Sequence, residues 1–120
     1  MGRRQITMTP KHELIKGSSN SLLLSLLAEQ PMYGYQIVKE LETRSQGYFK
    51  FKEGTLYPAL HRLENSGLIQ GDWQQLPNGR QRRYYRITAK GEAQLSHDKN
   101  QWEDFFTAIM MVMRPRTSEL

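Results

Sequence analysis

The stretch from Glu53 to Gly91 constrains the fold of this chain more than any other segment. It reads, in order, as a short amphipathic helix, a strand, a basic loop containing glycine, and a second strand. That order predicts the recognition half of a winged helix-turn-helix, in which one helix enters a DNA groove and a hairpin lies beside it. We therefore expect an α+β fold, mainly α, with three helices and a two-stranded wing.

The composition favours a polyanionic partner and excludes several kinds of site. The 120 residues carry 17 Lys and Arg against 12 Asp and Glu, which gives a net charge of +5. The absence of cysteine excludes disulfides, thiolate zinc sites and cysteine nucleophiles. Because the longest apolar runs are shorter than the roughly 20 residues of a membrane helix, we expect a soluble, cytoplasmic protein with no membrane partner.

The chain reads as one domain with a helical extension. The first helix is expected from Pro10 to about Glu29, with Thr9 as its N-cap, and the second from Tyr33 to Arg44. The third, Gly54 to Ser66, should stop at a left-handed Gly67. The predicted organisation is a flexible arm at 1–8, a winged helix-turn-helix domain at 9–88, a dimerisation helix at 89–113 and a tail at 114–120.

Helical periodicity separates the inward and outward faces of these helices. The outward face of the third helix should point into DNA, with Arg62 as the best candidate for a guanine or phosphate contact. Small or flat residues, Gly54, Pro58 and Ala59, would let its N-terminus sit deep in a major groove. A solvated helix face is the alternative interpretation. The residues expected inside are Leu14, Leu22, Leu23, Leu26, Leu27, Tyr33, Ile37, Val38, Leu41, Leu56, Leu60 and Leu63.

The predicted wing has strands at 68–75 and 82–88, joined through Asn78-Gly79, a dipeptide that favours hairpin turns. Two of its arginines, Arg80 and Arg82, are free to reach the DNA backbone or a minor groove. Five basic residues fall within eleven positions with no acid among them: Arg80, Arg82, Arg83, Arg86 and Lys90. Three large side chains of the strands are expected to pack inward: Trp73, Tyr85 and Ile87.

Three segments of the chain resemble the PadR family of bacterial transcriptional regulators. They are YGYQIVKEL (33–41), EGTLYPALHRLENSGLI (53–69) and GRQRRYYRITAKG (79–91), in the family's order and spacing. The resemblance implies a dimeric, repressor-like protein that binds a pseudo-palindromic operator in double-stranded DNA, with one C-terminal helix in place of a larger effector domain. The expected DNA-binding residues are Tyr33, Gly34, Gly54, Thr55, Tyr57, Pro58, His61, Arg62, Gly79, Arg80 and Arg82.

The residues after the wing indicate a dimerisation helix. Thr88 can cap a helix that runs to about Met113. Its apolar stripe exceeds what the small core can receive, so a two-fold mate is the economical partner. The alternative is that this helix packs on the chain's own first helix. The expected interface residues are Leu95, Trp102, Phe105, Phe106, Ile109, Met110 and Met113.

Trp102 has two candidate roles. By the resemblance, it matches a tryptophan with which some multidrug-responsive members of the family stack flat aromatic ligands. The bulky Phe106 departs from that pattern, because those members tend to have a charged residue at this position. We therefore favour a buried interface anchor, with a site for a small aromatic effector as the alternative. The residues that would line such a site are Leu14, Gly17, Ser21, Trp102 and Phe106.

The sequence gives no reason to expect catalysis, a cofactor or a metal. Its histidines lack paired metal-ligand spacing, and no nucleophile or phosphate-loop motif is present. The glutamates at positions 40, 42, 53 and 64 are interpreted as helix-surface acids. A second functional class stays open at this point: a winged-helix module for protein–protein interaction without specific DNA binding.

Overall fold

The structure, a computed structural model, describes the backbone of residues 10–116 and the side chains of residues 18–116. The expected N-cap Thr9 and the side chains of Leu14 and Gly17 lie outside this part. The elements follow in the order α1 (Pro10–Leu27), β1 (Met32–Tyr33), α2 (Gly34–Arg44), α3 (Glu53–Asn65), β2 (Ile69–Gln75), β3 (Gln81–Ile87) and α4 (Ala89–Met113).

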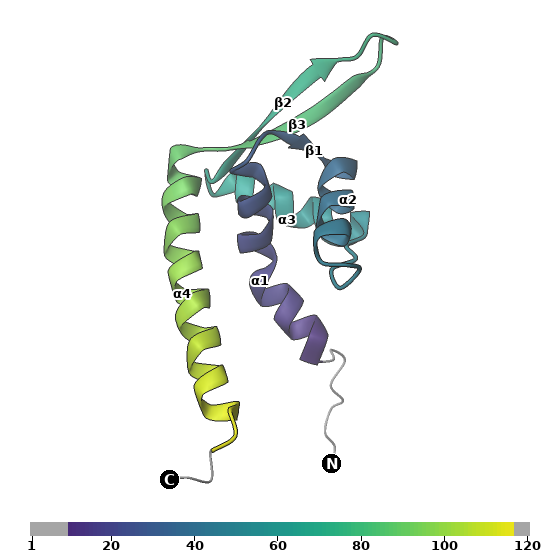
Figure 1. Ribbon diagram of the computed structural model, residues 1–120. Helices are drawn as coiled ribbons and strands as arrows, with labels where there is room; N and C mark the ends of the chain where they lie inside the picture. Colours follow the sequence, from purple (N-terminus) through teal and green to yellow (C-terminus); the bar gives the residue numbers. More distant parts are fainter. Residues whose placement is uncertain (1–9, 117–120) are drawn as a thin grey trace, which may run out of the picture.

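The fold is the expected mainly helical winged helix, with one strand more than the sequence analysis predicted (Figure 1). The antiparallel sheet has the order β1-β3-β2, with Met32 opposite Tyr85 and Tyr33 opposite Tyr84. Tyr33, expected to start the second helix, is therefore the last residue of β1 and the N-cap of α2. Two residues are too few to show the alternation by which a strand is recognised in a sequence.

The core lies between α1, α2, α3 and the base of the sheet. The predicted leucines and Ile37 that the structure describes are buried or packed against it, and Leu24 joins them. Ala59 was expected near the DNA-facing tip of the third helix. In the structure it is 1 % exposed and lies in the core, so that expectation was wrong. Its position on α3 falls between Leu56 and Leu63, three and four residues away, and so within the buried stripe.

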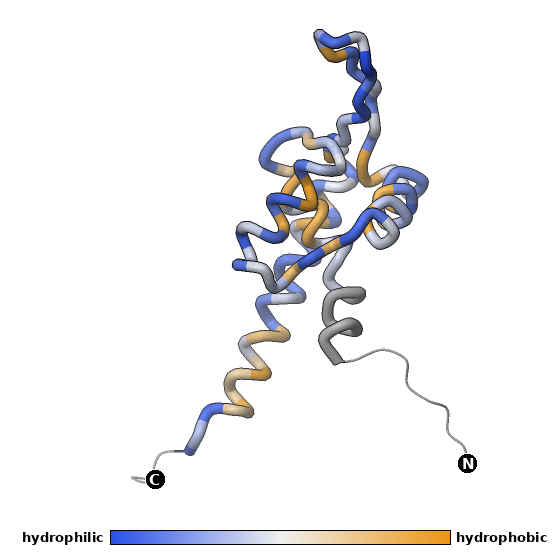
Figure 2. Tube along the Cα trace, turned by 90° about the vertical axis from the view of Figure 1, so that its right-hand side faces the viewer, coloured by the Kyte–Doolittle hydropathy of each residue, from blue (hydrophilic) through white to orange (hydrophobic). Residues whose placement is uncertain are grey.

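The elements place two surfaces at opposite ends of the molecule. In Figure 1 the hairpin of β2 and β3 projects beyond the helices at the top, while α4 runs downward beside α1. Figure 2 shows a mostly hydrophilic wing and a largely hydrophobic lower half of α4. Within residues 10–116, no helix is long and apolar enough to cross a membrane.

The turn before α4 is tied to the turn after α3. Gly67 ends α3 in the predicted left-handed conformation (φ +78°), and its carbonyl accepts a hydrogen bond from the Thr88 hydroxyl (2.7 Å). The same hydroxyl caps α4 by accepting from the Gly91 N–H (3.0 Å), and the Thr88 N–H donates to the Leu68 carbonyl (3.0 Å). A β-carbon at Gly91 would overlap that carbonyl. These contacts fix the direction in which α4 leaves the winged-helix domain.

Candidate nucleic-acid interface

The outward face of α3 presents polar and small residues to solvent. The leucines at positions 56, 60 and 63 are buried and fix the rotation of the helix about its axis. His61 and Arg62 consequently offer an imidazole and a guanidinium, two groups suited to base edges or phosphate. The predicted residues of this face are all exposed: Gly54, Thr55, Tyr57, Pro58, His61 and Arg62.

Pro58 lies in the second turn of α3. Its ring nitrogen cannot donate to the carbonyl of Gly54, which a helix would otherwise bond. Gly54 is exposed, and no atom lies within 4 Å of the place where its β-carbon would be. Water or a ligand at this face can satisfy the carbonyl, so the proline costs less here than in a buried helix.

Three of the five basic residues around the wing are engaged within the protein. Arg83 forms an ion pair with Glu64 (Nη2–Oε2 2.6 Å), and Arg86 forms one with Asp72 (Nε–Oδ2 3.2 Å). Lys90 donates to the carbonyl of the C-cap residue of α3 (2.8 Å). The segment 80–90 contains no acid of its own, but Glu64 on α3 and Asp72 on β2 neutralise part of its positive charge.

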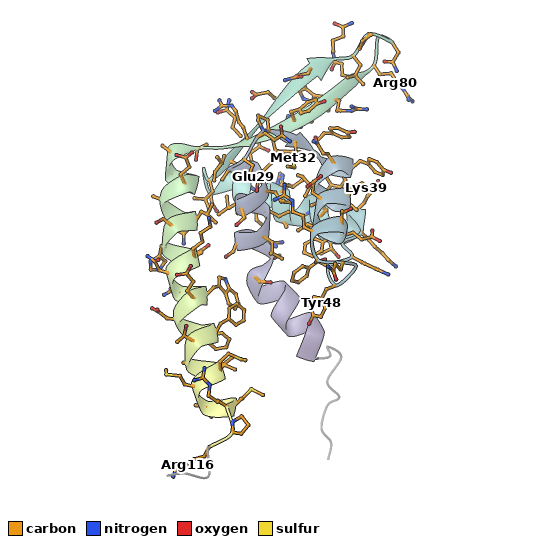
Figure 3. The ribbon with its side chains drawn as sticks, viewed as in Figure 1. Glu29, Met32, Lys39, Tyr48, Arg80 and Arg116 are labelled. Carbon is orange, nitrogen blue, oxygen red and sulfur yellow. The ribbon has the colours of Figure 1, made fainter. Side chains whose placement is uncertain are left out.

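Arg80 and Arg82 have no acidic partner among the residues that the structure describes. Figure 3 shows Arg80 at the hairpin tip, where its N–H donates to the side-chain oxygen of Asn78 (3.0 Å). The guanidinium carbon of Arg82 lies 3.9 Å from the ring centroid of Tyr33, which β1 places beneath it. A cation–π contact does not use the guanidinium N–H groups, so both arginines can donate to phosphate.

Glu64 joins α3 to the wing, a role that the sequence analysis missed. Expected as a surface acid, it is half-buried, and its Oε2 accepts hydrogen bonds from both Arg83 and the Gly71 N–H (3.1 Å). A β-carbon at Gly71 would overlap the Arg83 guanidinium, which would then have to move from its present position. No local sequence pattern links a helix acid to a strand arginine nineteen positions later.

Trp73 is exposed on the wing, contrary to the expectation that it packs inward. It is 62 % exposed, whereas Tyr85 is 7 % exposed and Ile87 packs against the core, as predicted. All three share one face of the hairpin, but β2 carries Trp73 beyond the end of the core. Its cross-strand partner Arg83 lies with the guanidinium carbon 5.5 Å from the indole centroid. Burial raises the pKa of the Tyr85 phenol.

Gly34 lies under Tyr57 rather than on the open surface, which corrects its expected place among the DNA-facing residues. It is buried, and a β-carbon there would overlap the Tyr57 phenol. Glycine at this position lets the phenol lie against the start of α2. Gly79, by contrast, is exposed at the hairpin tip with φ +88°, as the Asn-Gly turn signal indicates.

A cleft of about 420 Å³ lies between the start of α2, α3 and the wing. Aromatic rings and guanidinium groups together form its walls, so it combines apolar surface with positive charge. The side chains that line it include Tyr33, Tyr35, Tyr57, Trp73, Arg82 and Arg83.

The two ends of α4 differ in burial. Leu95, expected at a dimer interface, is 6 % exposed and belongs to the chain's own core, so it is not available to a partner. The far end is apolar and mostly open, with Phe105 47 % exposed and Val112 84 % exposed. The predicted residues Phe106, Met110 and Met113 lie in this exposed stretch, together with Met111, and Ile109 is half-buried.

Trp102 is half-buried between α1 and α4. Its indole N–H donates to the Ser21 hydroxyl (3.2 Å), which donates to the Asp98 carboxylate (3.0 Å). Phe106 stacks on the indole, with centroids 5.6 Å apart and 27° between the planes. Ser21, Trp102 and Phe106, the predicted pocket residues whose side chains are described, line an open groove of about 620 Å³. Tyr48, in the loop after α2, lines the same groove.

The described histidines do not form a metal site. His61 on α3 and His97 on α4 are both exposed. No group of three or more His, Asp or Glu side chains within residues 18–116 could hold a metal ion.

Several known proteins similar to this chain carry names that concern transcription. The sequence model of the transcriptional regulator PadR-like family matches residues 23–97. Transcriptional regulator Rv3488 of Mycobacterium tuberculosis is 35 % identical over 88 residues, which are 73 % of this chain and 78 % of that protein. A transcriptional regulator from Clostridium thermocellum has a TM-score of 0.78 and 32 % identity, covering 85 % of this chain and 99 % of that one. A PadR-like transcriptional regulator from Bacillus cereus has a TM-score of 0.77 and 29 % identity, covering 87 % and 99 %.

Proposed function

Because this chain belongs to the PadR-like family, whose members are non-enzymatic regulators that bind DNA, we propose that it is a homodimeric repressor of a pseudo-palindromic operator. The observation that carries the proposal is the exposed polar face of α3 beside a wing in which Arg80 and Arg82 have no acidic partner among the described side chains. In the proposed complex α3 occupies the major groove and the wing reaches the adjacent minor groove.

The interface residues divide by the contact that each makes in this complex. Arg62 and His61 reach base edges, since arginine pairs with the O6 and N7 atoms of guanine. Arg80 and Arg82 neutralise phosphates, which strengthens binding to any sequence. Tyr33 contributes indirectly, because its ring holds Arg82 in place.

We propose a second copy of the chain as the partner that covers the apolar end of α4. Exposed apolar surface of this extent on one helix supports a protein interface. In a two-fold dimer the same residues, Phe105, Phe106 and Met110, contribute from both chains. The pairing also sets the distance between two copies of α3, which must be about 34 Å to meet successive major grooves.

For a small aromatic effector, the groove beside Trp102 is the candidate site. Phe106 already stacks on the indole, so a planar ligand would have to displace it. This contact supports our proposal that Trp102 is mainly an anchor of the dimer. Calorimetric titration with planar aromatic cations tests the alternative, because saturable binding to the wild type that is lost in Trp102→Phe would establish an effector site.

Salt-dependent DNA binding tests the proposed function. A dye-labelled duplex of mixed sequence should bind at low salt and be released steeply as NaCl rises. The expected slope of log K against log salt is about −0.9 for each phosphate contact. If no duplex binds at low salt, the proposal is wrong and the interaction-module alternative takes its place.

Two arginine variants test the division between base and phosphate contacts. With duplexes selected from a random pool, Arg62→Ala should lower the preference for the selected sequence about tenfold. Arg80→Ala should weaken selected and mixed duplexes alike and reduce the salt slope by about 0.9. Equal losses on every sequence in both variants would remove Arg62 from the base-reading role.

A further inference from the structure

Three large aromatic side chains are exposed around the cleft between α3 and the wing. Tyr35 is 63 % exposed, Tyr57 44 % and Trp73 62 %. Exposed apolar surface gathered in one place marks a binding site more often than chance. Neither base reading by Arg62 nor phosphate binding at the hairpin tip uses these rings.

The position of the cleft identifies what would pass through it. In B-DNA one sugar–phosphate ridge separates each major groove from the neighbouring minor groove. In the proposed complex α3 lies in the first groove and the wing in the second, so this ridge must cross the space between them. The cleft of about 420 Å³ is that space.

The walls of the cleft match the two chemical parts of such a ridge. Deoxyribose presents apolar C–H groups, which pack on aromatic faces, and phosphate needs a cation with free N–H donors. Trp73 offers an exposed indole, and Arg82 is unpaired with acids throughout the described residues. We propose that the cleft seats one sugar–phosphate unit of duplex DNA, with Trp73 packed on the deoxyribose and Arg82 bound to the phosphate. This proposal rests on the proposed function.

Arg83 acts in this arrangement as a support for Trp73. Its guanidinium is paired with Glu64 (2.6 Å) and packs against Gly71, so its charge and position are fixed within the protein. The indole lies beside that guanidinium, 5.5 Å from ring centroid to Cζ. The Trp73 side chain is therefore preordered in the free protein, which reduces the conformational entropy lost on binding DNA.

Fluorine NMR tests the contact in the intact chain. The sequence has two tryptophans, so labelling with 5-fluorotryptophan gives two resonances, which Trp73→Phe assigns. On addition of a mixed-sequence duplex, the Trp73 resonance should shift with the midpoint at which the anisotropy of a dye on the duplex rises. If the anisotropy rises and the Trp73 resonance does not shift, the protein binds DNA but the proposed contact of Trp73 with deoxyribose is wrong. If the duplex does not bind, both the proposed function and the proposed sugar–phosphate contact are wrong.

Variants separate the apolar contact from the charged one. Trp73→Ala should weaken binding about tenfold with an unchanged salt slope, because no charge is removed, while Trp73→Phe should keep most of the affinity. Arg82→Gln should reduce the salt slope by about 0.9. Gln101→Ala, exposed on α4 and outside the wing, is the control. Equal losses in Trp73→Ala and Gln101→Ala, or a lower salt slope in Trp73→Ala, would overturn the proposal.

Discussion

The wing and the far end of α4 expose surfaces of opposite chemistry. At the wing the exposed groups are mostly polar or cationic, with the indole of Trp73 as an exposed aromatic group among them, and the acids Glu64 and Asp72 anchor arginines within the protein. At the end of α4 the exposed groups are apolar, including Phe106 and Met110 (Figure 2). Water solvates the first surface well, but leaving the second in water costs roughly 25 cal/mol for each Å². The wing end is therefore stable without a ligand, whereas the proposed partner at the α4 end should stay bound at all times.

Charging the apolar end of α4 should give the largest effect. Phe106→Glu together with Met110→Glu places like charges where two copies of the helix would meet, so the dimer should dissociate, as sedimentation would show. Affinity for a duplex with two half-sites should then fall at least about a hundredfold, to that of a single half-site. Gln101→Glu, exposed on the same helix, is the control. A double variant that stays dimeric would contradict the contrast between the two ends.

Adding a methyl group at the junction of the two regions should lower stability. In Gly91→Ala the β-carbon would overlap the Leu68 carbonyl, so the backbone must shift, at a cost of about 2 kcal/mol in the free energy of unfolding. Gly54→Ala is the matched control, since nothing lies within 4 Å of its β-carbon and alanine favours a helix. Urea denaturation measures both. Equal stability of the two variants would show that the junction is loosely packed.

Removing the charge of Glu64 should weaken DNA binding about threefold to tenfold. Glu64→Gln keeps an oxygen for the Gly71 N–H but loses the ion pair with Arg83, so the wing is held less firmly against α3. Removal of any acid near DNA also strengthens attraction to phosphate. Glu42→Gln on α2 is exposed and measures that general effect. Tighter binding by both variants would indicate that the ion pair does not position the wing.

Lowering the pH should have the smallest effect, through the loss of the stability that the ion pair of Glu29 and Arg44 contributes. The Arg44 guanidinium donates two hydrogen bonds to the Glu29 carboxylate (2.6 and 2.7 Å) and holds the pKa of Glu29 below its ordinary value of 4.5. The folded pKa is depressed, so the stability that this pair contributes is present above pH 4.5 and is lost as pH falls through the folded pKa. Because the pair is exposed, the contribution is small. Thermal melts of the wild type and Glu29→Gln should therefore converge in acid, and a constant difference would contradict the assignment.

The sequence predicted what depends on short spacings. Residues three and four apart share a helix face, so Leu56, Leu60 and the exposed Arg62 were placed correctly. Trp73 lies on the same face of the hairpin as Tyr85 and Ile87, with which it was grouped. The sequence could not show how far the core extends along that face, which depends on where the helices stop beneath it.

Contacts between distant segments were beyond prediction from one sequence. Pairing of Glu64 with Arg83 depends on the angle between α3 and the wing, and β1 exists only because two residues meet β3. Leu95 was assigned to the wrong surface for the same reason. The apolar pattern of α4 continues through it, but α1 and the sheet cover the first part of that pattern.

The hydrogen bonds around Thr88 fix the direction of α4, so a small change at its start becomes a large displacement at its far end. Its 25 residues span about 37 Å, and the helix cannot swivel at its start without breaking the bonds to Gly91 and Gly67. A change of about 10° in its direction would displace the far end by about 6 Å. In the proposed dimer, the geometry of this one turn would therefore contribute to the half-site spacing that the protein accepts, together with the pairing of the two helices.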